Sequence, residues 1–216
     1  MAAVKGSHFH WKETLICSVL CLRAANFKYM QHIEPFYNWR HLYTAEEDAR
    51  SPFFGRTYSE FEYSQTLYNF YIHPQWDGFG SPTMFLKILF VDYDAHFAVV
   101  EFLGEWNDAI ENDIMTLRRD VTDLLYKQGI FKFILIGENV LNFHSSDDSY
   151  YQEWFEQVED DHGWIALLNL PQQSRYDFDR ARLNNYLALF DTPQWRTLRP
   201  DVLFQLIDNG IMKRLL

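Results

Sequence analysis

Apolar and polar positions in the centre of the chain follow two different periods. Residues 85–93 and 97–103 are rich in β-branched and aromatic side chains, and the polar segment 94–96 between them is typical of a tight turn. This pattern predicts two strands joined as a hairpin, the second ending at Gly104.

A helical period follows the hairpin. Asp108 and Glu111 supply a start signal of the capping-box kind, and Gly129 supplies a stop, so the sequence predicts a helix over 107–128. The apolar residues that recur at helical spacing and form its inner stripe are Ile110, Ile114, Leu117, Val121, Leu124 and Leu125.

The same alternation continues toward the C-terminus. Residues 130–136 are nearly all apolar and predict a strand buried on both faces. Residues 147–160 predict a second helix, and 164–170 predict another buried strand that ends at Pro171. The inner side of the second helix is expected to carry Tyr151, Trp154, Phe155 and Val158.

Two further helices are expected after Pro171. Leu183, Leu187 and Phe190 fit one helical stripe, and Pro200 suits the first turn of a last helix that closes at Gly210. The residues expected to face inward on this last helix are Val202, Leu203, Leu206 and Ile207. These helices are too short to hold a core alone, so we expect them to pack on the sheet.

Strands that alternate with helices favour an α/β fold, with α+β as the alternative. The order predicts a mixed β-sheet made of a hairpin followed by βαβαβ, with the C-terminal helices packed on it. We expect one domain over 34–216. Residues 1–33 are read as an N-terminal extension, in which Met30 is a second candidate start.

The composition and net charge of the chain limit which kinds of molecule it is expected to bind. The chain has 216 residues, 48% of them hydrophobic, and a formal net charge of −11 without a basic patch, which argues against binding nucleic acid or an anionic membrane. The apolar run 14–22 is too short to span a bilayer. Cys17 and Cys21 are expected to be reduced, and the expected location is the cytoplasm.

Residues 97–171 carry a family resemblance. A strand ending in Gly104, a leucine-bearing helix ending at Gly129, a buried strand, a loop with paired serines, a helix and a further strand follow in that order. This order resembles the STAS domains of bacterial anti-sigma-factor antagonists such as SpoIIAA. The resemblance implies that the core is STAS-like and that Ser145, with Ser146 beside it, takes the place of the serine that is phosphorylated to control partner binding.

The same loop departs from the family pattern. His144 stands where the family has aspartate, and Asp147 and Asp148 follow the serines where the family has glycine-containing sequence. Two carboxylates in the first turn of the helix would repel a phosphate on Ser145. Helix capping alone also explains Ser145 and Ser146, so the resemblance indicates the fold more than the phosphorylation switch.

The sequence therefore favours a non-enzymatic regulatory or protein-interaction domain that binds a protein partner or associates with itself. The candidate binding or regulatory residues are Ser145, Ser146, His144, Glu138 and Asn139. We expect no catalytic residue, no cofactor and no resident metal, because no nucleotide, hydrolase or zinc motif is present.

A second function stays open. Glu101, Glu105 and Glu138 lie near predicted strand ends, where ligands gather in open α/β sheets. A carboxylate-lined site there would suit a small-molecule-binding protein or an enzyme, since burial of one carboxylate would prepare it for acid–base chemistry.

Overall fold

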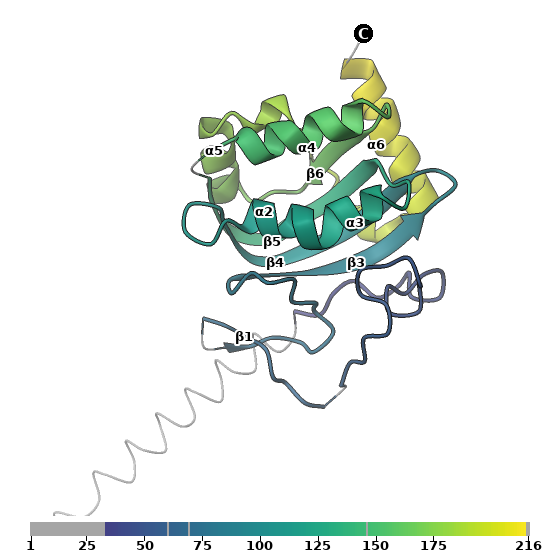
Figure 1. Cartoon of the computed structure of the whole chain (residues 1–216), viewed down its shortest axis with the longest axis vertical. Coiled ribbons are helices and arrows are strands. Elements are labelled where there is room, and N and C mark those ends of the chain that lie inside the picture. Colours follow the sequence, from purple (N-terminus) through teal and green to yellow (C-terminus); the bar gives the residue numbers. More distant parts are fainter. Residues whose placement is uncertain (1–32, 60, 69, 146, 215–216) are drawn as a thin grey trace, which may run out of the picture.

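Five strands form one mixed sheet in the computed structural model, which describes residues 33–214 except 60, 69 and 146 (Figure 1). The first two strands pair as an antiparallel hairpin, and each later strand pairs in parallel with the one before it. In sheet order the strands are β3 (Met84–Asp92), β4 (Phe97–Asn107), β5 (Lys132–His144), β6 (Trp164–Leu168) and β7 (Ala188–Phe190). The predicted hairpin followed by βαβαβ is confirmed, with β7 as an additional parallel strand.

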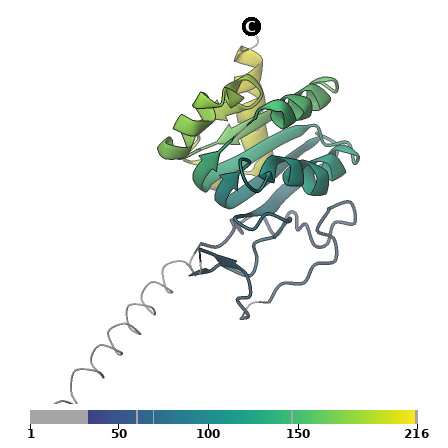
Figure 2. The ribbon, with the colours of Figure 1, turned by 60° about the vertical axis from the view of Figure 1, so that its left-hand side comes forward.

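Helices cover both faces of this sheet (Figures 1 and 2). One face carries α2 (Asp113–Leu117), the π-helical turn η1 (Arg118–Thr122), α3 (Asp123–Tyr126), α4 (Ser149–Glu159) and α5 (Gln172–Arg180). The other face carries residues 33–39, the short 3₁₀ helix η3 (Trp195–Thr197) and α6 (Pro200–Arg214). The prediction that C-terminal helices pack on the sheet is confirmed.

Residues 33–80 run beside β3 at one edge of the sheet and include the short pair β1 (Thr66–Leu67) and β2 (Phe70–Tyr71) (Figure 1). Asp77 joins this segment to the sheet through two backbone hydrogen bonds with Leu86. Its fully buried carboxylate also accepts hydrogen bonds from Lys87 of β3 at 3.2 Å and from Arg56 at 3.0 Å. A buried charge must be paired, so these contacts fix the segment in place. Cys17 and Cys21 lie outside the described residues.

The first helix begins later than predicted. β4 continues to Asn107, and α2 starts only at Asp113. The carboxylates of Asp108 and Asp113 accept backbone N–H groups of Ile114 at 2.8 Å and of Asn107 at 2.7 Å, which stabilises a turn before the helix. Ile110 is therefore 80% exposed, and the prediction that it belongs to the inner stripe is wrong.

The strand predicted over 130–136 is longer than expected, because β5 runs to His144. Its pairing with β4 shifts by one residue at two places, after Ile136 and after Val140. Each extra residue is a bulge, which bends a strand and re-aims its side chains. The polar residues Glu138 and Asn139 are thus part of a strand, although the strand predicted over 130–136 ended before them.

The C-terminal helices also differ in detail. Phe190 belongs to strand β7 and not to a helix; the helical stripe ends in the 3₁₀ helix η2 (Leu183–Asn185). α6 continues through Gly210 and buries Leu203, Ile207 and Ile211. Val202 and Leu206, predicted to face inward, are 43% and 50% exposed.

Candidate functional site

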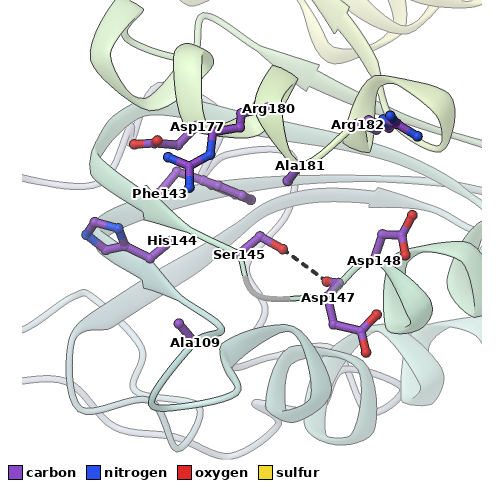
Figure 3. Close-up of a pocket in the computed structure, with 10 residues that line it drawn as sticks. All are labelled: Ala109, Phe143, His144, Ser145, Asp147, Asp148, Asp177, Arg180, Ala181 and Arg182. Atoms are coloured by element: carbon purple, nitrogen blue, oxygen red, sulfur yellow. Dashed lines mark hydrogen bonds between the residues drawn. The ribbon is translucent and has the colours of Figure 1, made fainter.

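A pocket of about 560 Å³ opens at the carboxyl end of β5. The strand outruns β6, with which it pairs only over Lys132–Ile136, and this extension carries residues 143–148 to the rim of the sheet. The residues that line the pocket are Ala109, Phe143, His144, Ser145, Asp147, Asp148, Asp177, Arg180, Ala181 and Arg182 (Figure 3). Two of the predicted residues, His144 and Ser145, are therefore brought together in one pocket.

Local hydrogen bonds set the shape of the loop between β5 and α4. The hydroxyl group of Ser145 donates to the backbone oxygen of Asp147 at 3.0 Å. One carboxylate oxygen of Asp147 accepts the backbone N–H of Ser149 at 2.8 Å. Asp147 therefore closes a tight turn just before α4, whose cap residue is Asp148 and has no side-chain capping bond, so neither Ser145 nor another side chain caps the helix among the described residues. Ser146 lies outside the described residues.

Aromatic side chains form the floor beneath this loop. Phe143 packs against Trp106, Tyr151 and Phe178, with ring centroids 5.5, 6.5 and 5.6 Å apart. All four rings are almost fully buried. Phe143 thus gives the pocket an apolar base that is packed against buried rings, and the polar groups of the lining lie around it.

The buried side chain of Asp108 connects these aromatic residues with the helices α2 and α4. It accepts hydrogen bonds from the hydroxyl of Tyr151, from the indole of Trp106 at 3.1 Å and from the backbone N–H of Ile114 at 2.8 Å. Burial raises the pKa of Asp108 to about 6, although these three donors oppose that rise. Burial also raises the pKa of Tyr151, so its hydroxyl stays protonated and serves as a donor.

Removing the hydroxyl of Tyr151 tests this arrangement. In Tyr151→Phe, Asp108 loses one donor to its buried carboxylate, and we expect the free energy of unfolding at pH 7 to fall by about 1–3 kcal/mol. The pKa of Asp108 should rise further, because the lost hydrogen bond favoured the charged form. Urea unfolding at several pH values measures both effects. Tyr176→Phe is the control, since Tyr176 is 70% exposed; equal losses in the two variants would contradict a special role for Tyr151.

The rim formed by the end of α5 was missed from the sequence. Arg180 lies in the last turn of the helix, and Arg182 follows it with a left-handed φ of 59°. Within the described part of the chain neither arginine forms an ion pair. The apolar spacing after Pro171 predicted helix, and no local signal in the sequence showed that the turn after Arg180 would lie near Ser145.

Glu138 and Glu101 form a second cluster, apart from the pocket and on the face covered by α6. Arg196 of η3 bridges the two carboxylates, with Glu101 at 3.0 Å. Trp195 also donates to Glu138 at 3.1 Å, and the backbone N–H of Phe36 donates to Glu101 at 2.7 Å. Burial raises the pKa of Glu101 to about 7. Both oxygens of Glu101 are thus held by protein donors.

The other two predicted positions have different surroundings. Asn139 pairs along the strand with Leu103. Glu105, the third carboxylate of the alternative site, accepts a hydrogen bond from Asn142 and does not join Glu101 and Glu138. Among residues 33–214, as far as they are described, no three His, Cys, Asp or Glu side chains form a group suited to a metal ion. In the same part of the chain, no helix combines the length and apolar character needed to cross a bilayer.

Comparisons with known proteins give a partial likeness of fold. No protein-family model matches the chain, and no curated protein matches it. The structure of the unphosphorylated anti-sigma factor antagonist SpoIIAA is 14% identical, with a TM-score of 0.44, and the match covers 57% of this chain and 96% of that one.

A protein from Thermotoga maritima, TM1081, assigned as an anti-sigma factor antagonist, is also similar. Its crystal structure is 22% identical with a TM-score of 0.38, covering 50% of this chain and 85% of that one. Its NMR structure is 15% identical with a TM-score of 0.38, covering 61% and 91%. The resemblance seen in residues 97–171 is found again among solved structures. It is a resemblance of fold.

Proposed function

We propose that this chain is a regulatory protein-interaction module, and that the pocket at the end of β5 receives a segment of a partner protein. One observation carries the proposal: the pocket is open, it lies beyond the carboxyl ends of parallel strands, and its rim presents Arg180 and Arg182, which form no ion pair with any other described residue. The polar groups beneath it, by contrast, serve the fold itself.

The buried acids support a non-enzymatic role. Asp108 and Glu101 have raised pKa values, which often mark catalytic groups. Here each of them is enclosed by protein donors that connect separate segments of the chain. The hydrogen bonds of these acids hold segments of the fold together, and the exposed rim is left for recognition.

Binding in this proposal does not depend on phosphorylation of Ser145. The backbone N–H of Ser149, which a phosphate at the start of α4 would use, is already bonded to the carboxylate of Asp147. Asp148 adds a second negative charge at the same helix end. Ser145 then contributes its hydroxyl group to the contact surface as an unmodified residue.

Filling the pocket tests the proposal. Ala109 is exposed at the mouth and lies in a turn, so Ala109→Trp adds bulk to the pocket with an expected change in stability within about 0.5 kcal/mol. Affinity capture from the native cells, quantified by mass spectrometry, should show at least one protein that is enriched on the wild-type chain and lost on the variant.

Tyr176→Trp is the matched control, because it adds a tryptophan at an exposed position of α5 outside the pocket lining. It should retain the partner. Equal capture by the wild type and by Ala109→Trp would contradict the proposal. A small molecule that copurifies with the wild type alone, detected by native mass spectrometry, would favour the alternative of a small-molecule-binding protein.

A further inference from the structure

The pocket has two walls that carry opposite charge. The last turn of α5 supplies Arg180 and the turn after it supplies Arg182, with Asp177 beside them on the same helix, and the residues just before α4 supply Asp147 and Asp148. In Figure 3 the two arginines lie above Ser145, while Asp147 lies below it and Asp148 to its right. A ligand in this space would meet guanidinium groups on one side and carboxylates on the other.

The two arginines are available to a ligand. Arg175, on the same helix, pairs with Asp191 at 2.6 Å, but in the described part of the chain Arg180 and Arg182 pair with no acid. Arg182 also adopts the left-handed backbone region, which residues other than glycine rarely enter. Guanidinium groups bind carboxylates through two parallel hydrogen bonds, so this wall suits a carboxylate.

The acidic wall is charged and has acceptor capacity left. The hydrogen bond from the N–H of Ser149 lowers the pKa of Asp147, so this side chain is ionised at neutral pH. Asp148 accepts one hydrogen bond, from the hydroxyl of Tyr186 at 3.1 Å. A carboxylate has room for several donors, so both residues can accept further hydrogen bonds from an ammonium or guanidinium group.

The charges of both signs in the lining disfavour a ligand that carries only one sign. The lining holds two arginines against three aspartates, the third being Asp177, which gives 2 − 3 = −1. A purely anionic group such as phosphate would be repelled by the acids, and a purely cationic group by the arginines. Phe143 at the base and the small Ala109 and Ala181 leave room for an aliphatic stem.

Resting on the proposed function, we infer that the partner segment is dipolar: an acidic side chain binds Arg180 and Arg182, and a basic side chain close to it binds Asp147 and Asp148. The order of the two charges then fixes the direction in which the segment lies. Recognition of this kind gives orientation and selectivity against segments of a single charge.

Capped peptides test the inference on the full chain. The probes are acetylated, amidated pentapeptides with the central sequences Glu-Leu-Lys, Glu-Leu-Glu and Lys-Leu-Lys, together with free leucine as a small dipolar molecule. Titrations followed by the backbone amide shifts of Ser145, Asp147 and Ala181 report binding. We expect saturable shifts with Glu-Leu-Lys, at least about tenfold weaker binding of the other probes, and weakening as salt is added.

Variants of each wall complete the test. Two double variants each remove the charge of one wall. The affinity for the Glu-Leu-Lys peptide should fall at least about tenfold in Arg180→Gln/Arg182→Gln, and by a similar factor in Asp147→Asn/Asp148→Asn. Asparagine keeps a side-chain oxygen that can accept the N–H of Ser149, so the second variant should retain the turn before α4. The control is Arg199→Gln with Asp201→Asn, an exposed Arg–Asp pair at the start of α6, which should change nothing.

Several outcomes would overturn the inference. Equal affinity for Glu-Leu-Glu would show a simple anion site, equal affinity for Lys-Leu-Lys an acidic patch, and equal affinity for free leucine a small-molecule site. Absence of shifts at these amides with all probes would also overturn it. If partner capture is lost in Ala109→Trp but kept in both wall variants, the proposed function stands and the dipolar partner does not.

Discussion

Gly104→Ala is expected to lower the free energy of unfolding by several kcal/mol. Gly104 has a φ of +123°, a region that side chains rarely adopt. An added Cβ would lie 2.1 Å from the backbone oxygen of Thr83 and 3.2 Å from the Cα of Met84. The strands β3 and β4 would have to separate at this point, because backbone atoms cannot rotate away as a side chain does. Strain and lost pairing together should amount to about 3 kcal/mol or more.

Gly55→Ala separates the two causes. Gly55 also has a positive φ, +74°, but a Cβ there meets no atom within 4 Å. The free energy of unfolding of Gly55→Ala should therefore fall only by the cost of backbone strain, on the order of 1 kcal/mol. Urea unfolding of both variants measures the difference. Equal losses of stability in the two variants would mean that the clash between an added Cβ at Gly104 and the backbone of Thr83 has no cost of its own.

The second large effect concerns pH. The folded-state pKa of Glu101 is about 7, above its ordinary value of 4.5, mainly because the side chain is buried. Between these two values the folded protein holds a proton that the unfolded chain has released. This contribution to stability is fully present below about pH 4.5 and is lost as the pH rises through about 7, on the order of 3 kcal/mol in all.

Glu101→Gln should remove that loss, because an amide does not ionise. The groups that act on Glu101 are Arg196 from η3, Glu138 from β5 and the N–H of Phe36, while Lys87 lies opposite it on β3. Urea unfolding from pH 4 to 8 should show a flatter profile for the variant than for the wild type.

Glu105→Gln, on the same strand, is the control and should keep the wild-type profile. Glu101→Gln should still lose some stability as the pH rises, because burial also raises the pKa of Asp108, to about 6. An undiminished fall in Glu101→Gln would assign the pH dependence to other groups.

Periodicity made the core of the fold predictable. The hairpin of β3 and β4, the helix α4 and the strand β6 match the residues whose apolar spacing indicated them. These elements are regular, and each buries a face that a short window of sequence reveals. The expected helix over 107–128 failed at its start, because Asp108 and Asp113 bind backbone groups of the turn, and a carboxylate that stabilises a turn looks the same as one that caps a helix.

The sequence predicted some residues of the candidate site and missed others. His144 and Ser145 came from the loop sequence, and the structure places both in the pocket. Glu138 and Asn139 were expected to follow the end of a strand, because polar residues after an apolar run usually end one. In the structure the strand β5 continues through both residues, with two bulges in its pairing with β4. Arg180 and Arg182 depend on how α5 lies beside β5, which is a tertiary contact and has no signature in local sequence.

The extension of β5 beyond β6 also bears on aggregation. Over residues 137–144 the strand has β4 on one side, and no described strand lies on the other. An open edge of this length is a template for pairing with another chain. α5 covers it: Ser174 donates to the backbone oxygen of Val140 at 2.8 Å, and Gln173 donates to that of Leu141 at 3.4 Å. The helix that carries one wall of the pocket therefore also shields the sheet from growing into a fibre.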